Sequence, residues 1–264
     1  MTSIPEIELA QNIYQQLAPI VYFDYKNNLI NYSQTPFEQS SSIKYAQLIT
    51  QIISQRFYKD QFVLPHTSTE NISSLNRVWY INPFKGSGNF VSGVPLYFTT
   101  LSLWEHNQPQ FTFIFDYFTH KYYWTQKTQT LIIEGEDKPL NTIQINKFTQ
   151  DIDSQFQSSI HSDKYHKLIH QLTQKGHQFI KLPNSLGLIY TAINKYSAYY
   201  SGNFNDEITY RAAYHFITNN HGYITTYNPL PYQNYPTPLF AANSQHNYNE
   251  FLTLLDQIQP STDI

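Results

Sequence analysis

The segment from Val78 to Thr125 constrains the fold more than any other part of the chain, because β-branched and aromatic residues dominate it. It contains four such runs, which read VWYI, PLYFTTLSLWE, FTFIFDYF and KYYWTQ. Turn-forming sequences separate these runs: Pro-Phe-Lys-Gly, His-Asn-Gln-Pro and Thr-His. Short apolar runs divided by turn residues predict consecutive strands of an antiparallel sheet.

An amphipathic helix is predicted before this sheet, because Leu9, Ile13 and Leu17 recur every four residues. Pro19 is expected to end that helix. The polar residues 24–42 are then expected to form a loop.

The rest of the chain contains both helix-like and strand-like patterns of apolar residues. The sequence predicts further helices over 43–57, 161–175, 184–196 and 210–220, short strands at FVLPH and over 223–227, and irregular structure over 134–160. Helices, then a sheet, then helices that alternate with strands indicate an α/β protein, a layered α/β/α/β sandwich. We interpret residues 1–264 as a single domain with a sub-boundary near 135–160.

Composition excludes several classes of function. The chain has 264 residues, of which 41% are hydrophobic and 13% charged, so it can bury a core and is not disordered. A net charge of −3 provides no basic field for nucleic acid. The absence of cysteine excludes disulfides, thiolate nucleophiles and Cys-ligated metals. We see no signal peptide and no apolar run of about 18 residues, so we expect a cytoplasmic protein that does not bind membranes.

Residues 79–95, WYINPFKGSGNFVSGVP, carry the main motif of the chain. An apolar strand led by tryptophan runs into a glycine-rich turn, and the matching anchors are Trp79, Pro83, Gly86, Asn89, Phe90, Gly93 and Pro95. In order and spacing the stretch resembles the signature of the inositol monophosphatase family, W-hydrophobic-hydrophobic-D-P-hydrophobic-D-G-T-x-N-F followed by G-x-P. That family consists of magnesium-dependent, lithium-sensitive phosphatases.

Weaker matches extend the resemblance over nearly the whole chain. They lie at residues 58–67, 181–185, 194–199, 209–214 and at Gly222. The resemblance implies an inositol-monophosphatase-like sandwich, and because the family commonly dimerises it also implies a homodimer.

The chemistry of the family depends on carboxylates. Its members hold two or three Mg²⁺ ions with a Glu, the two Asp of D-P-x-D and the Asp of W-D, because magnesium prefers anionic oxygen ligands. The ions neutralise the phosphate ester and activate a water. In this sequence the four corresponding positions hold His66, Asn82, Lys85 and Tyr210.

The family's site also uses a hydroxyl, that of the Thr in D-G-T. Of the family's site groups, only this hydroxyl has a counterpart here, in Ser87. A further upstream Asp of the family falls near Ser42 or Ile43. A site with four carboxylates carries about −4, whereas this one carries zero or about +1. Unit charges 4 Å apart interact by about 4 kcal/mol at an effective dielectric of 20. The Lys85 ammonium would therefore repel Mg²⁺.

The sequence accordingly predicts no catalytic residue, no metal site and no cofactor. We interpret the chain as a catalytically inactive member of the family, a pseudophosphatase with a binding or regulatory role. The alternative is a magnesium-dependent phosphomonoesterase with relocated ligands. Asp206 and Glu207 would be displaced ligands, or Glu70 would replace His66 if the alignment shifts.

An anion is the ligand that the altered turn favours. Lys85 would take the space of an ion, and Gly86, Ser87 and Gly88 would offer backbone N–H groups. Such a pocket would hold a phosphate-containing small molecule without metal.

Overall fold

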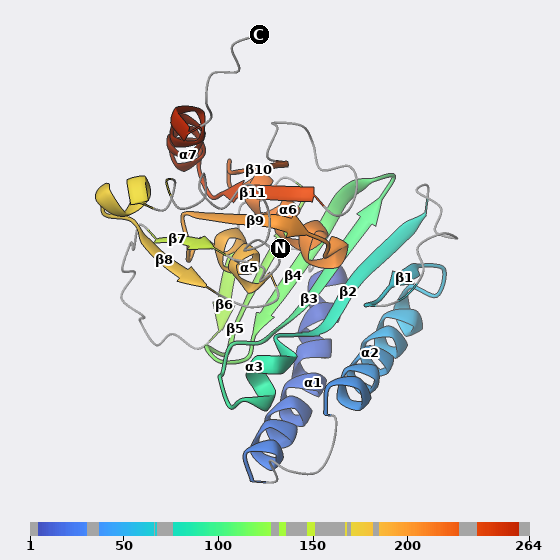
Figure 1. The fold of residues 1–264 in the computed structure, drawn as a ribbon. Coiled ribbons are helices and arrows are strands. Elements are labelled where there is room, and N and C mark those ends of the chain that lie inside the picture. Colours follow the sequence, from blue (N-terminus) through green and yellow to red (C-terminus); the bar gives the residue numbers. More distant parts are fainter. Residues whose placement is uncertain are drawn as a thin grey trace. The chain divides into compact units, whose positions relative to one another are not determined.

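The structure is a computed structural model that describes residues 5–30, 37–65, 67, 76–127, 132–135, 147–150, 167, 170–181, 185–226 and 237–258. These residues belong to two compact units, Met1–Lys138 and Pro139–Ile264, and each unit has its own sheet (Figure 1).

Two long helices begin the first unit, α1 (Pro5–Ile30) and α2 (Phe37–Arg56). The prediction that Pro19 ends the first helix, with a loop over 24–42, is therefore wrong. A proline inside a helix removes one backbone hydrogen bond, but α1 is also held by side-chain contacts beyond Pro19. Tyr22 donates a hydrogen bond to the carbonyl of Tyr117 (2.7 Å), and Tyr25 donates one to the carbonyl of Gly93 (2.8 Å).

Six strands form the sheet of the first unit, and they follow one another in chain order. They are β1 (Gln61–Val63), β2 (Arg77–Lys85), β3 (Phe98–Glu105), β4 (Gln108–Asp116), β5 (Lys121–Gln126) and β6 (Ile132–Gly135). β1 pairs with β2 in parallel, and every other pair is antiparallel. The antiparallel sheet predicted between Val78 and Thr125 is confirmed.

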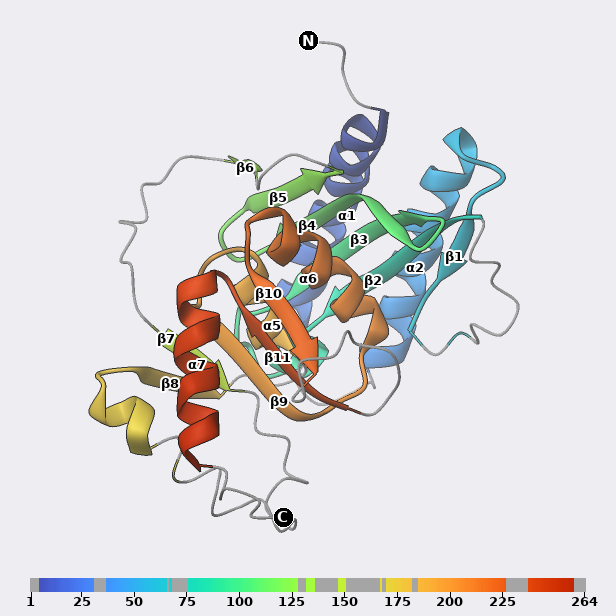
Figure 2. The ribbon, with the colours of Figure 1, turned by 90° about the horizontal axis from the view of Figure 1, so that it is seen from above.

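The two faces of this sheet differ in chemistry. One face packs against α1 and α2 (Figure 2), and its side chains are apolar: Trp79, Ile81, Leu101, Leu103, Phe111, Phe113 and Trp124. The opposite face carries buried hydroxyl groups, among them those of Thr100, Ser102 and Thr112. We call these the helix face and the polar face.

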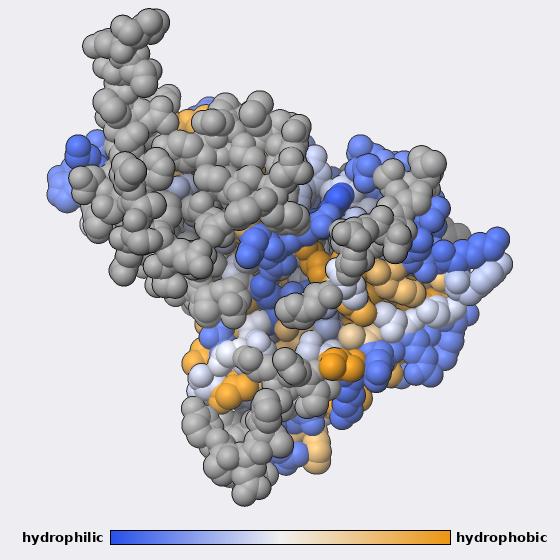
Figure 3. Space-filling model, turned by 45° about the vertical axis from the view of Figure 1, so that its right-hand side comes forward, coloured by the Kyte–Doolittle hydropathy of each residue, from blue (hydrophilic) through white to orange (hydrophobic). Residues whose placement is uncertain are grey.

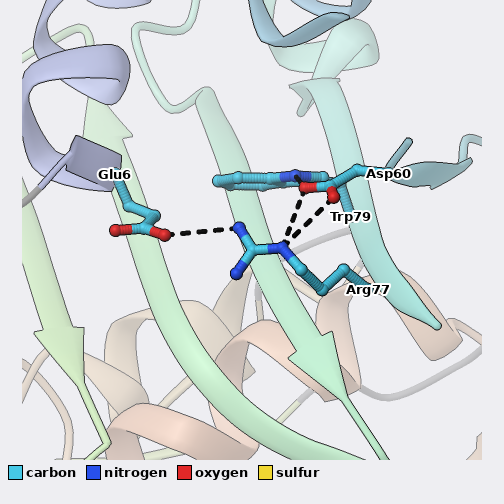
Figure 4. Close-up of polar contacts among 4 residues, drawn as sticks. All are labelled: Glu6, Asp60, Arg77 and Trp79. Carbon is cyan, nitrogen blue, oxygen red and sulfur yellow. Dashed lines mark hydrogen bonds and ion pairs between the residues drawn. The ribbon is translucent and has the colours of Figure 1, made fainter. Parts of the chain in front are cut away.

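An ion-pair network fixes the start of β2 (Figure 4). The Asp60 carboxylate accepts hydrogen bonds from the indole of Trp79 (2.8 Å) and from Nε of Arg77 (3.1 Å). Arg77 also pairs with Glu6 in the first turn of α1 (3.3 Å), and its guanidinium lies 5.0 Å from the ring centre of Phe57. The network thus joins α1, the turn after α2 and β2.

The second unit contains a five-stranded sheet with the order β10-β11-β9-β7-β8. Its strands are β7 (Lys147–Gln150), β8 (Gln178–Lys181), β9 (Ala198–Phe204), β10 (Tyr223–Thr226) and β11 (Thr237–Ala242). The helices of this unit whose bounds the structure describes are α5 (Leu186–Ala192), α6 (Glu207–Asn219) and α7 (Gln245–Ile258).

Several predictions for the second half need correction. The helices predicted over 184–196 and 210–220 exist as α5 and α6, although α5 is shorter, and the strand over 223–227 exists as β10. Residues 134–160 are not irregular throughout, because β7 lies within them. The sequence did not predict β8, β9, β11 or α7.

Aromatic packing places α7 against its sheet. The rings of Phe240 and Phe251 stack at 3.8 Å, and Tyr248 stacks on Tyr223 at 4.7 Å. None of the helices in the described ranges is long and apolar enough to cross a membrane. On the face shown in Figure 3, hydrophobic residues of the described parts form small groups among hydrophilic ones.

Candidate functional site

The candidate site begins at a β-bulge near the end of β2. Asn82 pairs with Thr100 of β3 and Lys85 pairs with Phe98, so residues 83–84 lie opposite a single residue of β3. An extra residue in one strand is the definition of a β-bulge. Since side chains alternate along β3, Asn82 and Lys85 both project from the polar face.

Phe84 projects from the helix face instead and anchors the bulge in the core. Its ring contacts four other aromatic rings at centre-to-centre distances of 4.8 to 6.2 Å, those of Phe90, Tyr97, Tyr45 and Tyr117. Aromatic pairs at these separations stabilise a core beyond their buried area.

Three buried hydrogen bonds hold the backbone of the bulge. The Asn82 Oδ1 accepts from the N–H of Phe84 (3.3 Å), and the Thr99 hydroxyl donates to the carbonyl of Pro83 (2.7 Å). Because that hydroxyl has a single proton, the Tyr117 hydroxyl, 2.7 Å away, is the donor to Thr99. Burial raises the pKa of Tyr117, which keeps it protonated as this role requires.

A glycine then turns the chain into the short helix α3 (Ser87–Val91), where the sequence predicted only a turn. Gly86 has φ 98°, and a Cβ there would lie 2.5 Å from the carbonyl oxygen of Leu96. Both the left-handed backbone and this close approach require glycine. At Gly88, by contrast, a Cβ would meet nothing within 4 Å.

The structure brings most of the predicted site residues together on this one turn. Asn82 is buried, Lys85, Ser87 and Gly88 are partly buried, and Gly86 is buried. Their polar groups are an amide, an ammonium and a hydroxyl. His66 and the alternative ligand Glu70 lie outside the described residues.

The groups at this turn do not match the ligands that magnesium prefers. The amide oxygen of Asn82 is already bonded to a backbone N–H, and Lys85 is a cation. Among the residues that the structure describes, no three or more His, Asp or Glu side chains gather as a metal site. The described part of the turn therefore offers none of the anionic oxygens that Mg²⁺ needs.

A carboxylate outside the family motif lies on α1 and contacts α2. Asp24 of α1 accepts a hydrogen bond from the hydroxyl of Tyr45 (2.7 Å), and Lys44 is 4.0 Å away. Burial and this hydrogen bond raise the pKa of Tyr45. Ile43, where an upstream acid was sought, is an exposed residue of α2. The loop expected over 24–42 gives no reason to place Asp24 on a helix beside Tyr45, so the sequence does not predict this contact.

Tyr210 belongs to the second unit, so its surroundings are those of α6. Its side chain is buried, and its ring lies 5.8 Å from that of Tyr214. Burial is the main cause that raises the pKa of Tyr210. A buried phenol of this kind is a neutral polar group rather than a metal ligand.

The two acids considered as relocated ligands have roles at the start of α6. Asp206 is the N-cap: it accepts from the N–H of Thr209 (3.0 Å) and from its hydroxyl (2.6 Å). Glu207 forms an ion pair with Arg211 one turn later (3.1 Å). Capping and i,i+4 pairing of this kind stabilise a helix.

Comparison with known proteins decides the relationship. The model of the inositol monophosphatase family matches residues 21–257. This chain belongs to the inositol monophosphatase family. A search of curated proteins by sequence found no match.

Solved structures of the family share the fold at low identity. Inositol monophosphatase II from Staphylococcus aureus MSSA476 is 15% identical, with a TM-score of 0.75 over 95% of this chain and 94% of the other. The extragenic suppressor protein SuhB from Bartonella henselae is 11% identical, with a TM-score of 0.75 over 99% and 100%. An IMPase/NADP phosphatase solved with NADP and Ca²⁺ is 14% identical, with a TM-score of 0.71 over 98% of both chains. The predicted inositol-monophosphatase-like α/β/α/β fold is confirmed.

Proposed function

We propose that this inositol monophosphatase family member is a pseudophosphatase, a binding or regulatory protein that holds a phosphate-type anion without metal. The observation that supports this most is the state of Asn82. Its amide oxygen, which a metal would need, accepts the N–H of Phe84 inside a buried bulge, and the ammonium of Lys85 projects from the same face.

The turn combines a restricted backbone shape with side chains that carry no negative charge. Gly86 and the bulge keep a backbone shape that only a few residue types allow. The side chains on that backbone have nevertheless lost the acids that would bind a cation. A retained shape with reversed charge suits an anionic ligand.

Lys85 is the residue expected to attract the anion, because lysine binds phosphate as a point charge. Gly86, Ser87 and Gly88 follow directly and would add polar contacts. The proposal includes no metal cofactor, and it keeps the homodimer and the cytoplasmic location expected from the sequence.

The enzymatic alternative is tested by a phosphatase assay. Inositol phosphates, sugar phosphates and adenosine bisphosphate would be offered with millimolar Mg²⁺, with and without EDTA. We expect no EDTA-sensitive turnover. Clear turnover that EDTA abolishes would instead support a phosphomonoesterase with relocated ligands.

Cation binding is tested by calorimetry with Mn²⁺. The wild-type chain should give no binding heat, whereas the double variant Asn82→Asp, Lys85→Asp should bind Mn²⁺ because it regains two carboxylates. The same change of charge at the exposed Asn194 and Lys195 is the control, and should not produce this binding. Tight Mn²⁺ binding by the wild-type chain would contradict the proposal.

Anion binding is tested by thermal unfolding with inorganic phosphate. A ligand at 100 times its Kd stabilises the folded state by about 2.7 kcal/mol. Lys85→Ala should abolish the phosphate-dependent rise in Tm, and Lys195→Ala, at an exposed lysine of the second unit, should preserve it. A rise that persists in Lys85→Ala would place the anion elsewhere.

A further inference from the structure

The polar face carries an unexplained hydroxyl beside the candidate site. Thr100 pairs directly with Asn82 across β3 and β2, so their Cβ atoms lie about 5 Å apart. Thr100 is 0% exposed, and its hydroxyl has no hydrogen-bond partner within the described parts of the chain. A buried polar group without a partner is costly and calls for an explanation.

Neighbouring hydroxyls on the same face show that Thr100 is an exception. Ser102 and Thr112 share a hydrogen bond of 2.8 Å, and Ser102 also accepts from the indole of Trp104 (2.8 Å). In the next cross-strand pair on this face, Ser102 and Thr112, the buried hydroxyls are therefore hydrogen-bonded. The unpaired hydroxyl lies in the row that contains Asn82.

The orientation of the Asn82 amide is set by the bulge. Because Oδ1 accepts from the N–H of Phe84, the Nδ2 group points away from that bond and retains two N–H donors. No hydrogen bond joins Nδ2 to another residue in the described ranges. Asn82 keeps 7% of its surface exposed, whereas Thr100 opposite it is fully buried.

We propose that Thr100 and Asn82 are ligand-contacting residues that, with Lys85, offer three hydrogen-bond donor groups to a tetrahedral oxyanion. Lys85 lies in the next cross-strand pair of the same face, opposite Phe98. An ammonium, an amide NH₂ and a hydroxyl all donate, so they fit a ligand whose atoms only accept, such as inorganic phosphate or the terminal phosphate of an ester. This inference rests on the proposed function and names the residues that select its ligand.

Thr100→Val tests the inference, because valine replaces the hydroxyl with a methyl group of similar size. Without ligand, the variant should unfold at the same temperature as the wild-type chain or higher, since an unpaired buried hydroxyl is removed. Its Kd for inorganic phosphate, measured by calorimetry, should rise about tenfold. Thr100→Ser, which keeps the hydroxyl, should bind phosphate as the wild-type chain does.

Thr112→Val is the matched control from the same face. Its hydroxyl is paired with Ser102, so this variant should lower the Tm without ligand and leave the phosphate Kd within twofold of the wild-type value. Asn82→Asp keeps the bond to Phe84 but replaces the donor with an anion, and should weaken phosphate binding more than tenfold.

The outcomes separate the two proposals. If Lys85→Ala abolishes phosphate binding but Thr100→Val leaves the phosphate Kd unchanged, Thr100 does not contact the ligand. The proposed function then still stands. If the wild-type chain binds no phosphate, both proposals are wrong. Should Thr100→Val fail to fold, Asn82→Asp decides, and an unchanged phosphate Kd in that variant overturns the proposed oxyanion site.

Discussion

The turn after β2 and the start of α6 correspond to two stretches where the family places metal ligands, and the polar side chains at the two places differ in kind and in their contacts. At the turn the acids are absent, and Asn82 and Lys85 stand in their positions. At α6 two acids are present, but Asp206 caps the helix and Glu207 pairs with Arg211. The comparison shows that the hydrogen bonds of a carboxylate, and not only its presence in the sequence, indicate whether it can serve a metal.

The shape of one place depends on the backbone, and the shape of the other depends on a side chain. The turn depends on backbone conformation at Gly86, whereas the start of α6 depends on the side chain of Asp206. Substitutions at the turn should therefore cost more than substitutions at the cap. Stability measurements on variants at both places test that order.

Gly86→Ala should have the largest effect. The new Cβ would lie 2.5 Å from a backbone oxygen at φ 98°, so we expect a loss of about 2–4 kcal/mol in the free energy of unfolding. Urea-induced unfolding measures it. Gly88→Ala, two residues further and free of close contacts, is the control and should change stability by about 0.5 kcal/mol or less. Equal losses in both variants would contradict the account of the turn.

The second largest effect is a pH-dependent loss of stability caused by His215, on the buried side of α6. His215 is 1% exposed, and burial lowers its pKa to about 4, from 6.5. Between these values the unfolded chain binds a proton that the folded chain does not, so stability falls as the pH falls. From pH 7 to pH 5 this residue should account for a loss of about 2 kcal/mol.

Urea unfolding at both pH values tests this dependence. His215→Leu should flatten the pH dependence by that amount, whereas His246→Gln, at an exposed position of α7, should leave it unchanged. An unaltered slope in His215→Leu would show that other groups cause the loss at low pH.

The smallest effect is expected at the cap itself. Asp206→Ala removes the acceptor for the N–H of Thr209 and should cost about 1 kcal/mol, while Asp206→Asn retains an acceptor and should cost less. Millimolar Mg²⁺ should not change the Tm of the wild-type chain. A magnesium-dependent rise that only the Asp206 variants lack would show that this acid binds metal after all.

The sequence predicted the first sheet well and the helices less well, for physical reasons. The alternation and the turn residues between Val78 and Thr125 are local signals, and local signals suffice for antiparallel strands. Pro19 is also a local signal, but tyrosine hydrogen bonds to distant carbonyls favour a longer helix. Those bonds join residues 95 and 68 positions apart, so no pattern in the sequence contains them.

The sequence names residues for the candidate site but does not predict how their side chains are oriented. The motif identified Asn82, Lys85 and Ser87 directly. Nothing in the sequence distinguishes Thr100 from Thr99, because the bulge at residues 83–84 decides which β3 hydroxyl lies opposite Asn82 and which contacts Pro83. A register shift of this kind appears only once the strands are paired.

The same bulge separates a packing residue from the polar residues beside it. Phe84 alone faces the aromatic interior, while the residues on either side of the bulge face away from it. Their chemistry could consequently be rewritten by single-codon changes during evolution without disturbing the packing that keeps the domain folded. Substitutions at Asn82 and Lys85 can therefore change what the turn binds while Phe84 keeps the end of β2 seated in the core.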